Sequence, residues 1–163
     1  MITLKKMQIS NALSEETMAY TADVFWQGRR LGHIRNNGGG GMSIFHLFEK
    51  GAKEDYEAAL AFAKTQTEDL GKEHGVMRFE FLEDYVDKVA EDQGNLQSAR
   101  RWLARAMKTK TVLFDDGKIY ACKAKWVGDT TMLEQRLKER HPNGIILNQL
   151  PEEDAIAKYL SAT

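Results

Sequence analysis

A run of asparagine and glycine occupies residues 36–41 of this 163-residue chain and is flanked by cationic side chains. Asn and Gly best tolerate a positive φ, and successive glycines expose backbone N–H groups that can surround an anion. Arginine can hold the same anion through paired N–H donors. The residues that could form such a site are Arg29, Arg30, Arg35, Asn36, Asn37, Gly38, Gly39, Gly40, Gly41 and His46. The chemistry that this segment suggests is the binding of a phosphate or another anionic group.

This glycine-rich loop does not match the established phosphate-binding motifs. No Lys-Ser/Thr pair follows the glycines, as a P-loop requires. An apolar run of strand length, residues 42–48, stands where the helix of a dinucleotide-binding fold would begin. A flexible hairpin connection, or the close approach of another segment, would also call for glycines. The sequence therefore leaves both a ligand-binding and a purely structural interpretation open.

Opposite charges are concentrated in two neighbouring segments. Residues 80–92 contain six acidic side chains and one lysine, whereas residues 100–110 contain five cationic side chains and no acidic one. Arg101, Arg105 and Lys108 recur at helical spacing and predict a cationic helix face. The two segments could pair as neighbouring helices, or the cationic face could contact an acidic partner. Because the formal net charge is -1, we expect protein surfaces as partners before duplex DNA.

No residue pattern identifies a catalytic or metal centre. The four histidines lack the spacing of metal motifs, and the single cysteine, Cys122, excludes an intramolecular disulfide and suits a reducing compartment. Asp23 and His33 fall on two strands that we expect to pair, where they could face each other. His33 or His46 could act as the base of a hydrolase or transferase if a second polar group lies within hydrogen-bond reach. We predict no cofactor and no metal.

The hydrophobic pattern predicts an α+β fold, in which an antiparallel or mixed sheet carries helices on one face. The Asp115-Asp116-Gly117 turn predicts a second hairpin. We expect one domain, residues 1–163, with possible lobes at 1–75 and 76–163. The expected strands are 2–9, 17–26, 30–35, 42–48, 111–114, 118–126 and 145–147. The expected helices are 52–70 closed by Gly71, 79–92, 96–108, one from Asp129 to about Arg140, and one opened by Pro151.

Residues 14–24, with the sequence Ser-Glu-Glu-Thr-Met-Ala-Tyr-Thr-Ala-Asp-Val, are followed by Gly28, Gly32 and the loop at 36–41. This pattern resembles one found in small, mostly uncharacterised proteins of phages and bacterial mobile elements, and residues 145–151 resemble their carboxy-terminal segment. The resemblance implies an accessory factor that binds and blocks a host or defence protein. It supplies no catalytic residues.

No stretch approaches the roughly 20 apolar residues of a membrane span, and the amino terminus lacks a signal-peptide pattern. We therefore expect a cytoplasmic protein, in the host cell cytoplasm if it is phage-encoded. The leading hypothesis is a non-enzymatic binding protein that uses the glycine-rich loop with its arginines and the face of Arg101, Arg105 and Lys108. One alternative is a nucleotide- or cyclic-nucleotide-sequestering protein that uses the loop, and a second is a hydrolase or transferase with a histidine base.

Overall fold

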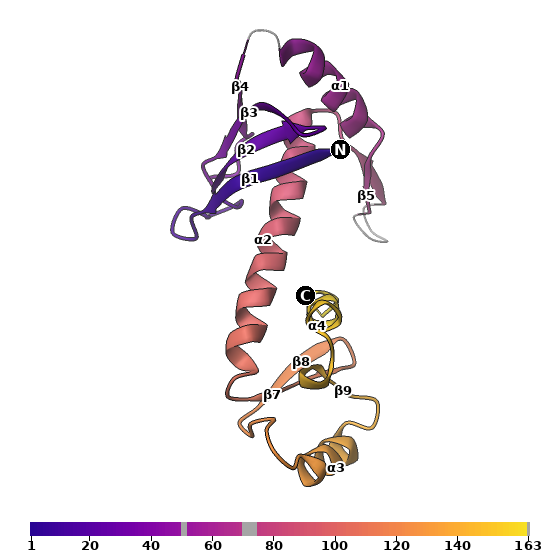
Figure 1. The fold of residues 1–163 in the computed structure, drawn as a ribbon. Coiled ribbons are helices and arrows are strands. Elements are labelled where there is room, and N and C mark those ends of the chain that lie inside the picture. The colour runs from indigo at the N-terminus through magenta and orange to yellow at the C-terminus, as the bar shows by residue number, and fades with distance from the viewer. Residues whose placement is uncertain (50–51, 70–74, 163) are drawn as a thin grey trace. The chain divides into compact units, whose positions relative to one another are not determined.

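The computed structural model describes residues 1–49, 52–69 and 75–162. It divides the chain into two compact units, Met1–Gly94 and Asn95–Thr163. Helices combine with antiparallel sheets in both units, which confirms the α+β class (Figure 1). None of the helices in the described ranges is long and apolar enough to cross a membrane.

The first unit is built around a four-stranded antiparallel sheet with the order β1-β2-β3-β4. The expected alternation in residues 17–26 appears in β2, where Ala22 and Val24 are buried on one face of the sheet. The strands are β1 (Ile2–Ile9), β2 (Tyr20–Trp26), β3 (Arg29–Asn36) and β4 (Ile44–Leu47). The unit also contains α1 (Lys53–Lys64), β5 (Thr67–Asp69), β6 (Val76–Arg78) and the first part of α2 (Leu82–Ala106).

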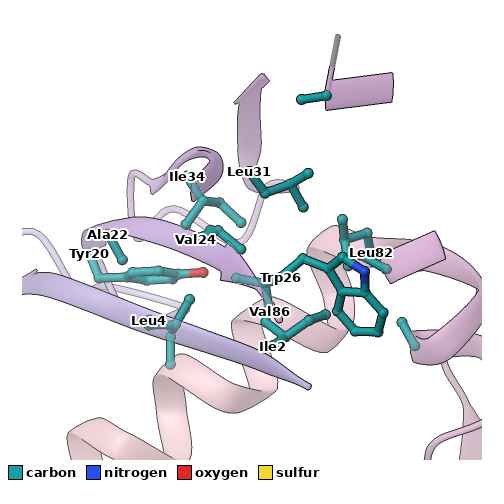
Figure 2. Close-up of a cluster of buried hydrophobic side chains, with 14 residues drawn as sticks. Ile2, Leu4, Tyr20, Ala22, Val24, Trp26, Leu31, Ile34, Leu82 and Val86 are labelled. Carbon is teal, nitrogen blue, oxygen red and sulfur yellow. The ribbon is translucent and has the colours of Figure 1, made fainter. Parts of the chain in front are cut away.

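The core of the first unit lies between one face of this sheet and the two helices. Leu82, Val86 and Ala90 recur every four residues on α2, so they form one apolar stripe against the sheet. Figure 2 shows the apolar side chains of the strands together with Leu82 and Val86 of α2. The sheet side chains of this core are Ile2, Leu4, Tyr20, Ala22, Val24, Trp26, Leu31 and Ile34. The opposite sheet face carries most of the polar residues of the strands.

The second unit contains a three-stranded sheet with the order β8-β7-β9. Asp116 and Gly117 both have a positive φ, 46° and 71°, as a tight two-residue hairpin turn requires, so the hairpin is confirmed. Its elements are β7 (Thr111–Asp115), β8 (Lys118–Cys122), α3 (Thr131–Arg140), β9 (Ile145–Ile146), the 3-10 turn Leu147–Gln149 and α4 (Glu152–Leu160). The N–H of Thr131 donates to the Asp129 carboxylate at 3.0 Å, and Pro151 directly precedes α4.

The helix expected over residues 52–70 is shorter than predicted, because its last third is not helical where the structure describes it. The Thr65 hydroxyl donates to the carbonyl oxygen of Phe62 at 2.7 Å, a local bond that competes with continuation of the helix, and α1 ends at Lys64. Strand β5 begins at Thr67 and pairs with β6. Leu70 and Gly71, expected to end this helix, lie outside the described residues.

The two helices expected at 79–92 and 96–108 are one helix, α2. Gly94 does not interrupt it, because this glycine is helical and buried, and a Cβ there would lie 3.0 Å from both Ile9 Cδ1 and Met18 Sδ. The acidic and cationic segments are therefore not two separate helices, and most of their charged residues belong to one helix. Acidic residues occupy its first turn and Arg105 its last, an order that the helix dipole favours.

Smaller differences concern the ends of elements. β2 begins at Tyr20 and not at residue 17, and β8 ends at Cys122 and not at residue 126. Leu147 belongs to the 3-10 turn and not to the strand before it. Because α2 ends at Ala106, Lys108 lies beyond the helix and does not continue the cationic face of Arg101 and Arg105.

Candidate functional site

The face of the first sheet that points away from the core carries a row of polar residues from all four strands. The register pairs Lys5 with Asp23, Asp23 with His33, and His33 with His46. Residues that are directly opposite on neighbouring strands point to the same face. We call this surface the outer face. Its members are Thr3, Lys5, Lys6, Gln8, Thr21, Asp23, Phe25, Arg30, His33, Arg35, Ile44 and His46.

The outer face is strongly cationic although the whole chain is nearly neutral. The side chains of this face include four Lys and Arg residues, two His residues and a single carboxylate, that of Asp23. A bulge in β1 between Lys5 and Gln8 gives Lys6 a φ of 52°. Because of this bulge, two consecutive lysines reach the same side of the sheet.

Asp23 is the buried centre of this row. Its Oδ1 accepts a hydrogen bond from Arg30 Nη2 at 2.8 Å, and Oδ1 lies 3.3 Å from His33 Nδ1. Lys6 Nζ lies 3.6 Å from Oδ2. The hydrogen bond from Arg30 is the main cause that lowers the pKa of the Asp23 carboxyl, with contributions from His33 and from the charges of Arg30 and Lys6, against the opposing effect of burial. Asp23 is therefore an ionised anchor that orders cations above it.

Two aromatic rings support the cations of the outer face. Lys5 Nζ lies 4.4 Å from the ring centroid of Phe25, and the Arg30 guanidinium lies 4.0 Å from that of Phe48. Such contacts hold a cation in place while its charge faces solvent. Arg35 is exposed on the same face, and within the described ranges it has no ion-pair partner. Arg29, by contrast, pairs with Asp55 of α1.

The glycine-rich loop is held by bonds inside the protein. Asn36 Oδ1 accepts the N–H of Gly38 at 2.8 Å and the hydroxyl of Thr17 at 3.1 Å. The Gly40 N–H points to Thr17 Oγ1 at 3.4 Å. The carbonyl oxygen of Gly38 accepts the N–H groups of residues 15, 16 and 17 at 3.1, 2.9 and 3.1 Å. Two of the four glycine N–H groups are thus engaged within the protein, which favours the structural interpretation of the loop.

A buried polar network ties the loop to α2. Asn36 Nδ2 donates to Ser43 Oγ at 3.0 Å, and Ser43 Oγ donates to Asp87 Oδ1 at 2.5 Å. The Tyr20 hydroxyl donates to the same Asp87 oxygen at 2.5 Å. Burial, together with the hydrogen bond and the charge of Asp87, raises the pKa of Tyr20 far above its ordinary value. Sequence reasoning missed this network, because no spacing rule links Ser43 to a carboxylate 44 residues away.

Other residues that the sequence suggested lie in different surroundings. Arg101, Arg105 and Lys108 are exposed in the second unit, whereas the loop and the outer face belong to the first. Asn37, Gly39 and Gly41 are exposed in the loop. Cys122 is half-buried at the end of β8, and His74 lies outside the described residues.

A histidine base was expected to need a second polar group within hydrogen-bond reach. The Asp23 carboxylate is such a group for His33. The same carboxylate also pairs with Arg30 and Lys6, so its contact with His33 is one of several ionic contacts on this face. Across the ranges 1–49, 52–69 and 75–162, no three His, Cys, Asp or Glu side chains are grouped to hold a metal ion. Comparisons with protein-family models, curated proteins and solved structures found no match to this chain.

Proposed function

We propose that this chain is a non-enzymatic cytoplasmic binding protein that captures an acidic segment of a protein partner on the outer face. The observation that carries the proposal is the presence of Lys5, Lys6, Arg30 and Arg35 on one face of the sheet, where Lys6 and Arg30 pair with the buried carboxylate of Asp23. The resemblance to phage and mobile-element proteins suggests the biological role of such capture, an accessory factor that blocks a host or defence protein.

The arrangement of the cations supports binding more than catalysis. Lys5 and Arg30 lie over aromatic rings, which reduces the conformational freedom that each would lose on meeting a partner. Complementary charge accelerates association and selects the partner, and salt weakens its effect. Sequestration of a nucleotide by the glycine-rich loop has less support, because Gly38 and Gly40 already use their N–H groups within the protein.

A histidine-dependent hydrolase is the second candidate, and the contact between His33 and Asp23 favours it. Asp23 would hold the His33 Nδ1 proton, which leaves Nε2 as the base. A screen of phosphodiester and ester substrates with wild type and His33→Ala tests this candidate, since loss of turnover in the variant would assign the base.

The binding function is tested with a fluorescent peptide of about ten residues rich in Glu, by fluorescence anisotropy over a series of salt concentrations. The reversal Lys5→Glu with Arg35→Glu should weaken binding about tenfold or more, because it changes two exposed cations of the outer face. The matched control is Lys123→Glu with Lys125→Glu, which makes the same charge change at exposed positions of the second unit. Equal weakening by both pairs would contradict the proposal. Tighter binding of a single-stranded RNA with equal charge would contradict it as well.

A further inference from the structure

Strand β4 is an edge of the first sheet in the described part of the chain, because it pairs with β3 alone. The N–H of Phe48 donates to the carbonyl oxygen of Leu31 at 3.1 Å, on the side of β3. Bonding direction alternates along an antiparallel strand, so Ile44 and His46 also face β3. The N–H and C=O groups of Phe45 and Leu47 therefore point away from β3, toward the unpaired edge.

The side chains of this edge are apolar and exposed to an unusual degree. Met42 is 68% exposed, Ile44 49%, Leu47 43% and Phe48 54%. Natural edge strands are commonly protected by Lys, Pro or an inward-pointing charge, and Ile44–Leu47 contains none of these. An apolar edge with backbone groups that point outward is a template for another strand.

The two faces of β4 differ in chemistry. Ile44 and His46 lie on the outer face, next to Arg35 and His33 of β3. Phe45 and Leu47 lie on the core side, where Phe45 packs against the core. A strand beside β4 would place alternate side chains next to Ile44 and His46, with Arg35 one strand further away, and next to Phe45 and Leu47. The complementary strand therefore alternates acidic and apolar residues.

We propose that the acidic partner segment binds by adding an antiparallel strand to β4, with its acidic side chains on the outer face and its apolar side chains beside Phe45 and Leu47. This inference rests on the proposed function and specifies how the partner is held. Main-chain hydrogen bonds to Phe45 and Leu47 supply affinity, while Arg35 and His46 select acidic residues. The partner is thus recognised as an extended segment and not as a helix or a folded acidic surface.

The probe is a fluorescent octapeptide of alternating Val and Glu, with two derivatives of the same charge and composition. In the strand that we propose, Val residues lie opposite Phe45 and Leu47 and direct their N–H groups at β4. N-methylation of Val should reduce affinity at least tenfold, whereas N-methylation of Glu should leave it within about twofold. Equal affinity of the two methylated peptides would overturn strand addition.

A substitution in β4 tests the main-chain hydrogen bond that we propose between Leu47 and the added strand. Leu47→Pro removes an N–H that points away from β3, so no hydrogen bond of the sheet is lost, and proline is tolerated on edge strands. We expect at least tenfold weaker binding, with Leu47→Val as the control that keeps the N–H. Wild-type affinity in Leu47→Pro would overturn the inference. If this variant does not fold, the comparison of the two methylated peptides is the test of strand addition.

The outcomes separate this inference from the function on which it rests. If Lys5→Glu with Arg35→Glu abolishes binding while Leu47→Pro and N-methylation do not, the outer face binds acidic partners without strand addition, and the inference is wrong. If neither the Glu-rich peptide nor the alternating peptide binds, the proposed function itself fails, and the inference fails with it. A dimer of the chain that is lost in Leu47→Pro would assign the edge to a second copy and would also overturn the inference.

Discussion

His33 Nδ1 lies 3.3 Å from Asp23 Oδ1, and the two residues are directly opposite each other on β3 and β2. This contact places a buried carboxylate in the middle of a cationic row and gives the row a fixed geometry. Without Asp23, the cations of neighbouring strands would repel one another on one face of a sheet. The carboxylate therefore stabilises the fold and at the same time arranges the surface that we propose for binding.

Asp23→Asn tests the stabilising role of this carboxylate. The substitution keeps the size of the side chain and removes its charge, so Arg30 and Lys6 lose their counter-ion. We expect the free energy of unfolding at pH 7 to fall by about 1–3 kcal/mol, as for hydrogen bonds to charged groups. Urea denaturation measures the change, and Asp116→Asn, at an exposed turn position, is the control.

The effect of Asp23→Asn should depend on pH in a defined direction. Because the pKa of Asp23 is lowered in the folded protein, its stabilisation is present above the unfolded pKa of about 3.9 and is lost as the pH falls through the folded pKa. The difference in unfolding free energy between wild type and Asp23→Asn should shrink as the pH falls below about pH 4. A difference that stayed constant down to pH 2 would contradict the assigned pKa direction.

Gly38 and Gly39 allow a matched test of the glycine-rich loop. A Cβ at Gly38 would lie 2.0 Å from the carbonyl oxygen of Leu13, and its φ is 86°, whereas a Cβ at Gly39 would meet nothing within 4 Å. Gly38→Ala should therefore destabilise the protein by about 1–3 kcal/mol or more. Gly39→Ala should change the stability by no more than about 0.5 kcal/mol. Thermal and urea unfolding measure the stability of both variants. Similar losses of unfolding free energy in the two variants would show that the loop is not docked as described.

Gly32 controls how closely β4 approaches β3. A Cβ there would lie 2.4 Å from the carbonyl oxygen of His46 and 2.6 Å from Phe45 Cε1, so the strand or the ring must move. We expect Gly32→Ala to cost about 1–3 kcal/mol and to detach β4 locally. Hydrogen exchange of the Phe48 N–H, which bonds to Leu31, should accelerate in Gly32→Ala and not in Gly41→Ala. Unchanged protection would mean that β4 adapts without separation.

Much of the fold could be predicted from local patterns, because strand alternation and the Asp116-Gly117 turn depend on residues that are close together in the sequence. The errors arose where a distant contact overrides local preference. Gly94 suggested a helix end, yet it is a helical residue that Ile9 and Met18 approach closely. No local pattern indicated the short strands β5 and β6, each of three residues.

The candidate site was predictable in part for the same reason. Hairpin periodicity suggested that Asp23 and His33 could face each other, and the structure confirms this contact. The participation of Lys5 and Lys6 depends on the pairing of β1 with β2, which the sequence does not reveal. It also depends on a bulge at Lys6, which is visible in the sequence as a slip in the apolar alternation between Leu4 and Met7. The sequence suggested an anion site at the glycine-rich loop because it did not reveal the internal partner of the loop, Thr17, which lies nineteen residues before Asn36.

The network around Asp87 predicts a stability change at alkaline pH. The pKa of Tyr20 is raised in the folded protein, so the stabilisation by its protonated hydroxyl is complete below the unfolded pKa of about 10 and is lost as the pH rises above it. Tyr20→Phe should cost about 1–2 kcal/mol at pH 7, because Asp87 loses one of its two donors, and this cost should decrease above about pH 10.

Ser43→Ala removes the other donor, and its cost should not decrease with the ionisation of a tyrosine. Since both hydroxyls bond to Asp87 Oδ1, the double variant should deviate from additivity by about 0.5 kcal/mol or more. Additive costs at pH 7, or a cost of Tyr20→Phe that grows above pH 10, would show that the two hydroxyls do not share this carboxylate.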